Sequence, residues 1–205
     1  MDSSRARDEI LSFVDSMRES SKFVFSYKLF KDAEANPFAS CFALYLRYLL
    51  GDLEKLSNSE KEEWIIYLKD FQNPESGIFS DPEAVNRVVD ERHDSIHLDR
   101  QFTTFCISAL DCLDSKADYP LNFLQDFYNQ EKFLSWVNNL DWSNSSNSGN
   151  KVMFIAICAI YNYEQFGDKN SKDLLENWFY WMDNNQNPET GFWGTSKNTQ
   201  YFNGV

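Results

Sequence analysis

Two histidines lie four residues apart in an acidic stretch of the chain, and their side chains are suited to acid–base chemistry. His93 and His97 occur in the sequence Asp90-Glu-Arg-His-Asp-Ser-Ile-His-Leu-Asp99, where Asp94 directly follows the first histidine. An imidazole titrates near neutral pH and a neighbouring carboxylate can orient it, so this pattern is typical of a general base. We therefore predict His97, His93 and Asp94 as catalytic residues. The alternative is that His93 and Asp94 cap a helix and that His97 packs as a buried polar residue.

A polar stripe continues from His97 along the expected helix. Gln101, Thr104 and Ser108 follow it at positions i+4, i+7 and i+11, which places the four side chains on one side of a helix. Such a stripe on a mainly apolar helix either lines a wet cavity or bonds a neighbouring helix. On the first alternative, Gln101 and Thr104 bind substrate.

Asp141 and Trp142 form a second candidate binding site, directly before the polar segment 143–149. An indole ring can stack on a sugar or another polyol while a carboxylate accepts hydrogen bonds from its hydroxyl groups. Asp141 and Trp142 are therefore predicted substrate-binding residues. The alternative is that Asp141 replaces a structural glutamine of the repeat described below.

The elements that must position these residues are helices, because apolar residues recur at helical spacing along almost the whole chain. Three expected helices are apolar on most faces, at about 37–50, 97–113 and 150–166. Three others carry a charged face, at about 58–71, 120–140 with a break near Asn129, and 169–185. Apolar helices must be surrounded and amphipathic ones meet water, so we expect alternating inner and outer helices.

The N-terminal part precedes this alternation. A first helix is expected at about 7–18. A second is expected at 22–31, although its sequence Phe23-Val-Phe-Ser-Tyr is also compatible with a short strand. The fold class is all-α in either case.

A repeated element closes the outer helices. Tyr67-Leu-x3-Gln72-Asn-Pro-Glu-Ser-Gly77-Ile-Phe79 matches the segment from Trp181 to Trp193, Trp-Met-x3-Gln-Asn-Pro-Glu-Thr-Gly-Phe-Trp, position for position. A degenerate middle copy contains Asp141 where the others have glutamine. In each complete copy we expect the glutamine to bond open backbone groups, Asn-Pro to end the helix and glycine to adopt a positive φ. Repetition of this kind is typical of arrays of helical hairpins.

This element resembles the QW motif of the terpenoid cyclase and protein prenyltransferase superfamily. The resemblance covers about residues 37–205; the Trp193 copy matches fully, and the first copy has Phe79 in place of tryptophan. It implies an α/α-toroid, with inner and outer helices around a central cavity. We therefore expect one toroid-like domain over residues 1–205, with about three hairpins of an incomplete ring, as in a chain truncated at its C-terminus.

The best-known chemistries of that superfamily lack support in this sequence. Squalene-cyclase-like enzymes carry an Asp-x-Asp-Asp acid motif, which does not occur here, and the zinc-binding set of the prenyltransferases is not matched. Phosphate-binding glycine-rich motifs are missing as well. We predict no metal and no cofactor.

The net charge of −13 disfavours partners that are nucleic acids or anionic membranes. No apolar run approaches the length of a membrane span, and the N-terminus lacks a signal-peptide core, so a cytoplasmic location is expected. The four cysteines are scattered, mostly in apolar runs, and are expected to be buried and reduced.

Two functions stay open. The first is an enzyme, cyclase-like or carbohydrate-active, that acts on a small terpenoid-like or carbohydrate-like substrate in a central cavity. The second is a non-catalytic helical-repeat scaffold whose uncovered inner face binds a protein partner or a second copy that completes the ring.

Overall fold

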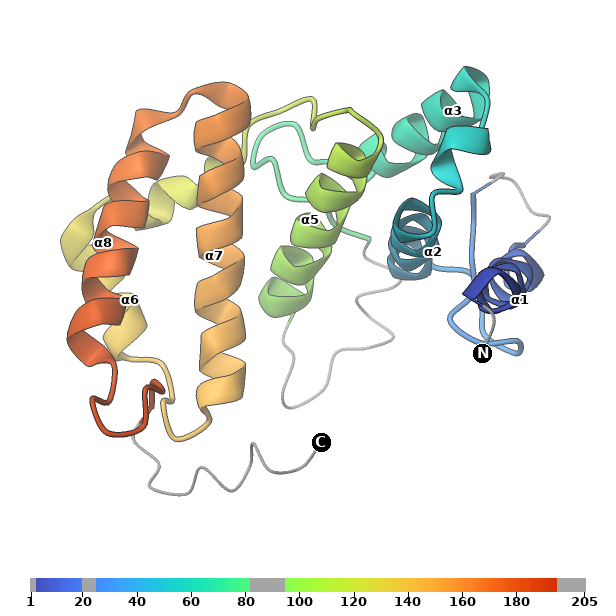
Figure 1. Cartoon of the computed structure of the whole chain (residues 1–205). Helices are drawn as coiled ribbons and strands as arrows, with labels where there is room; N and C mark the ends of the chain where they lie inside the picture. The colour runs from blue at the N-terminus through green and yellow to red at the C-terminus, as the bar shows by residue number, and fades with distance from the viewer. Residues whose placement is uncertain (1–2, 20–24, 82–94, 195–205) are drawn as a thin grey trace. The chain divides into compact units, whose positions relative to one another are not determined.

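The computed structural model describes residues 3–19, 25–81 and 95–194. Within these ranges the chain is helical (Figure 1), as the sequence predicted. The extended pairings in the same ranges are isolated bridges between single residues, at Arg18 with Tyr27, Lys28 with Ala35, and Gln72 with Phe79. The chain divides into two compact units, Met1–Tyr119 and Pro120–Val205. The single domain expected over residues 1–205 stays a prediction.

In the first unit the longest described helix packs against two of the others. The elements of this unit are α1 (Ser3–Ser16), α2 (Pro37–Leu49), the short 3-10 helix η1 (Leu53–Lys55), α3 (Asn58–Lys69) and α5 (Ser95–Cys112). Helix α5 packs against both α2 and α3, and α1 packs against α2. Side chains without solvent exposure fill the space between them, among them Leu44, Trp64, Leu68, Phe102 and Cys106.

The second unit contains a long helical hairpin. Its elements are the 3-10 helix η2 (Asn122–Phe127), α6 (Gln130–Asn138), α7 (Ser145–Phe166) and α8 (Lys169–Asn185). Helices α7 and α8 lie side by side, α6 packs on α8, and η2 packs on α6 and α7 (Figure 1). A buried amide joins these layers, because Asn162 of α7 accepts a hydrogen bond from the backbone N–H of Leu121 at 2.8 Å.

Capping residues set several helix ends at the predicted places. Ser57 and Glu60 form a reciprocal capping box at the start of α3. Helix α7 ends at Gly167, whose φ of 69° is the left-handed conformation that glycine favours. Helix α8 has the predicted bounds, and its cap is Asp168, which accepts a hydrogen bond from the N–H of Asn170.

The helix expected at 22–31 is wrong for its described part. Residues 25–31 form turns and bridges, because Lys28 donates its backbone N–H to Met17 and Ser26 accepts from Glu19, both at the end of α1. The rings of Phe25 and Tyr27 then stack on buried Trp64, with centroid distances of 4.4 Å and 5.7 Å. This long-range packing outweighs the local helical spacing.

The segment expected as a helix at 120–140 is broken near Asn129, as predicted, but its first half is a 3-10 helix. Helix α7 begins at Ser145, earlier than expected, because Asn144 accepts from the N–H of Asn147 and caps it there. Helices α2, α5 and α7 bury more of their residues than α3, α6 and α8 do. This matches the burial expected of inner and outer helices.

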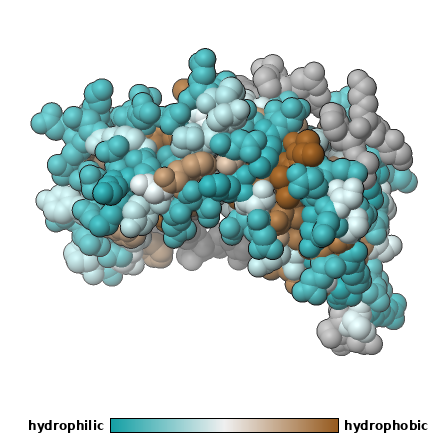
Figure 2. Space-filling view, turned by 90° about the horizontal axis from the view of Figure 1, so that it is seen from above, coloured by the Kyte–Doolittle hydropathy of each residue, from teal (hydrophilic) through white to brown (hydrophobic). Residues whose placement is uncertain are grey.

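Hydrophilic residues dominate the face seen in Figure 2, and hydrophobic residues gather on it in separate patches. Among the described helices, none has the length and hydropathy needed to cross a membrane. All four cysteines are described and carry thiols rather than disulfides; Cys41, Cys106 and Cys158 are buried, and Cys112 is partly exposed. Burial raises the pKa of the Cys106 thiol well above its usual value.

Candidate functional site

The predicted histidine cluster is described only in part. His97 lies in the first turn of α5 and is buried, with 3% of its surface exposed. His93 and Asp94 lie outside the described residues. The catalytic role of the three residues therefore stays a prediction.

The polar stripe that follows His97 makes bonds within the helices of the first unit. The hydroxyl of Thr104, which is buried, donates to the backbone carbonyl of Gln101 at 2.7 Å. Tyr45 of α2 donates to the carbonyl of Phe105 at 2.7 Å, and burial raises the pKa of its phenol. These contacts agree with the packing alternative for the stripe, while substrate binding by Gln101 and Thr104 stays untested.

The repeated element forms the same turn twice, at 72–79 and 186–193, and we call these the first turn and the second turn. In the first turn Asn73 accepts from the N–H groups of Glu75 and Ser76, both at 2.9 Å. Gln72 donates to the Gly77 carbonyl at 3.1 Å. The second turn repeats these bonds, with Asn187 accepting from Glu189 and Thr190, and Gln186 donating to Gly191 at 2.8 Å. The two central glycines, Gly77 and Gly191, have the same φ of 73°.

The surroundings of the two turns differ. Gln72 is buried, donates to the carbonyl of Tyr119 at 2.7 Å, and accepts from the N–H groups of Asp118 and Tyr119. Phe79 is fully buried, and its N–H donates to the hydroxyl of Thr103 on α5 at 3.0 Å. In the second turn, by contrast, Gln186 is exposed and Trp193, the counterpart of Phe79, is only half-buried; Phe192 beside it is exposed as well.

Asp141 and Trp142 face different surroundings. The exposed carboxylate of Asp141 accepts from the N–H of Ser143 at 3.0 Å and from its hydroxyl at 2.5 Å, and these bonds lower the pKa of Asp141. Trp142 stacks on Trp181 of α8 at 4.8 Å and donates its indole N–H to the carbonyl of Val137. Only Trp142 lines the pocket described next, so the structure does not bring the two predicted residues together around one cavity.

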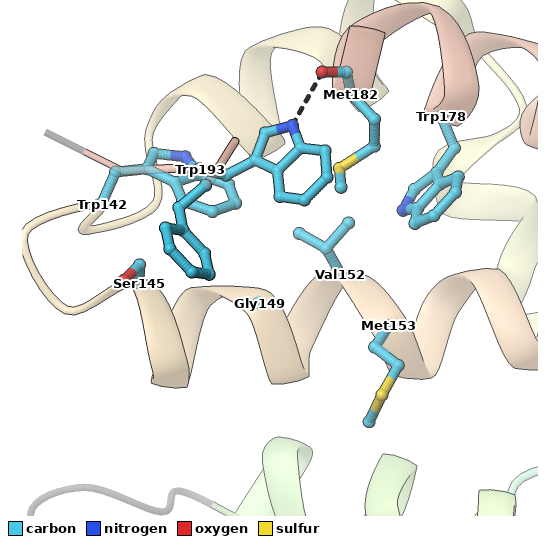
Figure 3. A pocket seen from close by; sticks show the side chains of 9 residues that line it. Trp142, Ser145, Gly149, Val152, Met153, Trp178, Met182 and Trp193 are labelled. Carbon is cyan, nitrogen blue, oxygen red and sulfur yellow. Dashed lines mark hydrogen bonds between the residues drawn. The ribbon is translucent and has the colours of Figure 1, made fainter. Parts of the chain in front are cut away.

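A pocket of about 220 Å³ lies in the second unit between the start of α7, the end of α8 and the second turn (Figure 3). We call it the tryptophan pocket, because three indoles are among its walls. Its described lining consists of Trp142, Ser145, Gly149, Val152, Met153, Trp178, Met182, Phe192 and Trp193. Of these residues, none has an ionisable side chain, and Ser145 supplies the one hydroxyl.

The turn approaches the start of α7 closely at the rim of this pocket. A Cβ added to Gly194, whose φ is 132°, would lie 2.9 Å from the carbonyl oxygen of Trp142 and 3.0 Å from Cβ of Ser145. The Trp193 indole donates to the carbonyl of Met182 at 2.7 Å and fixes the turn to α8. A Cβ added to Gly149, in contrast, would meet nothing within 4 Å, so this glycine leaves space open on α7.

The Trp178 indole differs from those of Trp142 and Trp193, which donate to backbone carbonyls. The indole nitrogen of Trp178 is shielded from solvent, and the described residues include no hydrogen-bond partner for it. Figure 3 shows its ring with the nitrogen edge toward the side of Val152 and Met182. The sequence pattern gave no binding role to Trp178 or Met182, although their spacing places both on one face of α8 and Gly149 on α7 offers a small residue opposite them.

Among the described residues, no group of three His, Cys, Asp or Glu side chains is arranged to hold a metal ion. No family model, curated protein or solved structure matches this chain.

Proposed function

We propose that this protein binds a small, mainly apolar, terpenoid-like ligand in the tryptophan pocket. The observation that carries the proposal is the lining, where three indoles, a phenyl ring, two thioethers and a valine surround a cavity of about 220 Å³. Concave, mainly apolar pockets with a few polar groups are the usual form of small-molecule sites. Methionine adapts its shape to irregular ligands, and aromatic rings supply large apolar contact areas.

The size of the pocket limits the ligand. An engineered apolar cavity of about 150 Å³ stays dry and binds benzene. By that proportion, the tryptophan pocket accommodates a molecule of roughly nine non-hydrogen atoms. Norcamphor, a bicyclic ketone of the terpenoid type, is within this size and serves as the probe.

The lining favours a terpenoid-like ligand over a carbohydrate-like one. A sugar needs a hydrogen-bond partner for most of its hydroxyl groups, because unpaired buried polar groups are costly. The indole N–H groups of Trp142 and Trp193 are already engaged with backbone carbonyls. That leaves the Ser145 hydroxyl and the Trp178 N–H as polar side-chain groups on the described walls.

Binding is the activity that this lining supports, since its described residues carry no acid or base. Catalysis at His97 is a separate part of the proposal, and its test is the turnover of a His97→Ala variant that keeps the circular dichroism spectrum of the parent. The α/α-toroid arrangement is likewise proposed, on the strength of the repeated turn and the alternating burial of the helices.

The experiment fills the pocket without disturbing the fold. Gly149→Leu directs a side chain into the open space beside α7, while Gly149→Ala adds only a methyl group. Both variants remove a glycine from a helix, and replacing glycine by alanine there stabilises the helix by roughly 0.5–1 kcal/mol. Norcamphor is titrated against each protein, with tryptophan fluorescence as the readout. We expect saturable binding to the parent and to Gly149→Ala, and at least tenfold weaker binding to Gly149→Leu. Equal binding to both variants, or none to the parent, would contradict the proposal.

A second candidate function rests on the contrast between the two turns. The first turn binds an apolar helix, α5, through the Thr103 hydroxyl and binds the following backbone through Gln72. The second turn has the same internal bonds but exposes Gln186 and Phe192. A partner protein that presents an apolar helix with a threonine in the place of Thr103 matches this surface.

The probe for this candidate is a labelled peptide with the sequence of α5, 95–112, and its Thr103→Val form is the matched control. Partner binding at the second turn predicts that the peptide binds the full chain, that Gln186→Leu weakens binding, and that the valine peptide binds more weakly. Failure of the peptide to bind would exclude this surface as a receptor for such a helix.

A further inference from the structure

The indole N–H groups around the tryptophan pocket have different partners. Trp142 donates to the carbonyl of Val137, Trp193 to the carbonyl of Met182, and Trp181 to the side-chain oxygen of Asn138, all at 2.7 to 2.8 Å. Trp178 lies on the pocket wall with its indole nitrogen shielded from solvent, and no partner for that nitrogen occurs in the described part of the chain. The pocket therefore presents two side-chain donors in a mainly apolar surface, the Ser145 hydroxyl and the Trp178 N–H, and the Trp178 N–H is the one that is shielded from solvent.

Its position distinguishes this donor from the similar nitrogen of Trp64 in the first unit. The Trp64 nitrogen also has no partner among the described residues, but its ring is fully buried and stacked against Phe25 and Tyr27. The Trp178 ring borders the tryptophan pocket, and Figure 3 shows its nitrogen edge directed toward the Val152 and Met182 side of the lining. As the side chains stand, this nitrogen is shielded from water-sized atoms, so a ligand oxygen meets it only when the neighbouring lining side chains shift around the ligand. Such a shift would pair a donor that protein folding leaves unsatisfied.

We infer that Trp178 is a specificity-determining residue that donates a hydrogen bond to an oxygen atom of the ligand. The ligand class is then an oxygenated terpenoid-like molecule, such as a ketone, alcohol or ether, rather than a pure hydrocarbon. This inference rests on the proposed ligand-binding function of the pocket. Sites with a buried donor discriminate against analogues that lack the acceptor, because the donor is then left unpaired in a dry environment.

The test compares two ligands of nearly the same shape. Norcamphor carries a carbonyl oxygen, and norbornane is the corresponding hydrocarbon. Dissociation constants of both are measured for the parent, for Trp178→Phe, which keeps an aromatic ring without the N–H, and for Trp181→Phe, which lies outside the pocket lining and whose N–H is engaged with Asn138. Taking the ratio of the two constants for each protein cancels the different costs of removing the two ligands from water.

We expect the preference for norcamphor over norbornane to fall roughly tenfold in Trp178→Phe, which corresponds to about 1.4 kcal/mol, and to stay within about twofold of the parent in Trp181→Phe. An unchanged preference in Trp178→Phe overturns the inference, while binding of both ligands still supports the pocket. Failure of both ligands to bind the parent overturns the proposed function itself.

A second measurement on the parent protein decides the matter if Trp178→Phe does not fold. The indole N–H proton of Trp178 gives a nuclear magnetic resonance signal that is assigned by selective labelling. A hydrogen bond to the ligand predicts a downfield shift of this signal with norcamphor and a much smaller shift with norbornane. The inference is overturned if the Trp178 indole N–H signal shifts equally with both ligands, or if it shifts with neither ligand at saturation.

Discussion

The first and second turns share a sequence pattern and a set of internal bonds, yet the first buries its glutamine and its closing aromatic ring while the second does not. Both have an asparagine that accepts two backbone N–H groups, a glycine with a φ of 73°, and a glutamine that donates to that glycine's carbonyl. Only the first turn encloses a fully buried ring, that of Phe79. Local sequence therefore determines the shape of the element, and the elements packed around it determine what the element does.

The glutamine shows this difference most clearly. Gln72 joins the first turn to Asp118 and Tyr119 through three further hydrogen bonds, at 2.7 to 3.1 Å. Gln186 is exposed, and its described bond stays inside the turn. In the first unit the turn is a structural joint, and in the second unit it is a wall of the tryptophan pocket.

The largest expected effect is the loss of this joint. Gln72→Leu leaves several backbone groups of the first unit without their partner, and we expect the free energy of unfolding to fall by about 3 kcal/mol. Gln186→Leu should cost less than about 1 kcal/mol, because its site is solvated. Urea unfolding followed by circular dichroism measures both. Equal losses in the free energy of unfolding would contradict the expected difference between the two glutamines.

A smaller effect is expected where α5 meets the first turn. The buried hydroxyl of Thr103 accepts from the N–H of Phe79 and donates to the carbonyl of Asp99 at 2.7 Å. Thr103→Val leaves the Phe79 N–H unpaired, and we expect a loss of about 2 kcal/mol. Thr104→Val is the matched control on the same helix, since its hydroxyl bonds only a carbonyl within α5 among the described contacts. If Thr104→Val lowers the free energy of unfolding as much as Thr103→Val does, the bond between Thr103 and the Phe79 N–H is not the cause of the loss.

The bonds inside the two turns are the same, so removing them should lower the free energy of unfolding equally in both turns. Asn73→Ala and Asn187→Ala each remove a side chain that accepts two N–H groups of its own turn. We expect losses of about 1 kcal/mol in the free energy of unfolding for both variants, measured by urea unfolding. A difference of more than about 1 kcal/mol between them would mean that the surroundings also govern the inner part of the turn.

The smallest effect is a pH dependence at the first turn. Partial burial raises the pKa of Asp99 above its ordinary value of 3.8, and the hydrogen bond from Ser80, at 2.6 Å, opposes the rise. A raised pKa in the folded state contributes stability that is fully present below the unfolded pKa and is lost as the pH rises through the folded pKa. We expect Asp99→Asn to reduce this decline above pH 3.8, as measured by urea midpoints across a pH series. The exposed Asp111→Asn change on the same helix is the control and should leave the decline in place.

Much of the helical framework could be predicted from the sequence. The start of α3, the bounds of α8 and the break near Asn129 were predicted, and all depend on residues close together in the chain. The helix expected at 22–31 is wrong because Phe25 and Tyr27 pack on Trp64, a contact between distant parts of the sequence. Local spacing cannot report such a contact.

The candidate site was predictable to a smaller extent. Trp142 was selected for its aromatic ring next to a polar segment, and it does line the tryptophan pocket. Trp178 lies on a helix whose pattern indicates only an amphipathic outer helix, so its shielded nitrogen becomes visible only once α7 and α8 are packed together. The open space beside Gly149 likewise depends on that packing.

A crystal structure of the protein with norcamphor decides whether the tryptophan pocket is a ligand site. We expect ligand density in this pocket, in contact with Val152 and Met182, with the ketone oxygen within hydrogen-bond distance of the Trp178 nitrogen. A pocket that stays empty at saturating norcamphor, or that is filled by other residues of the chain, would contradict it.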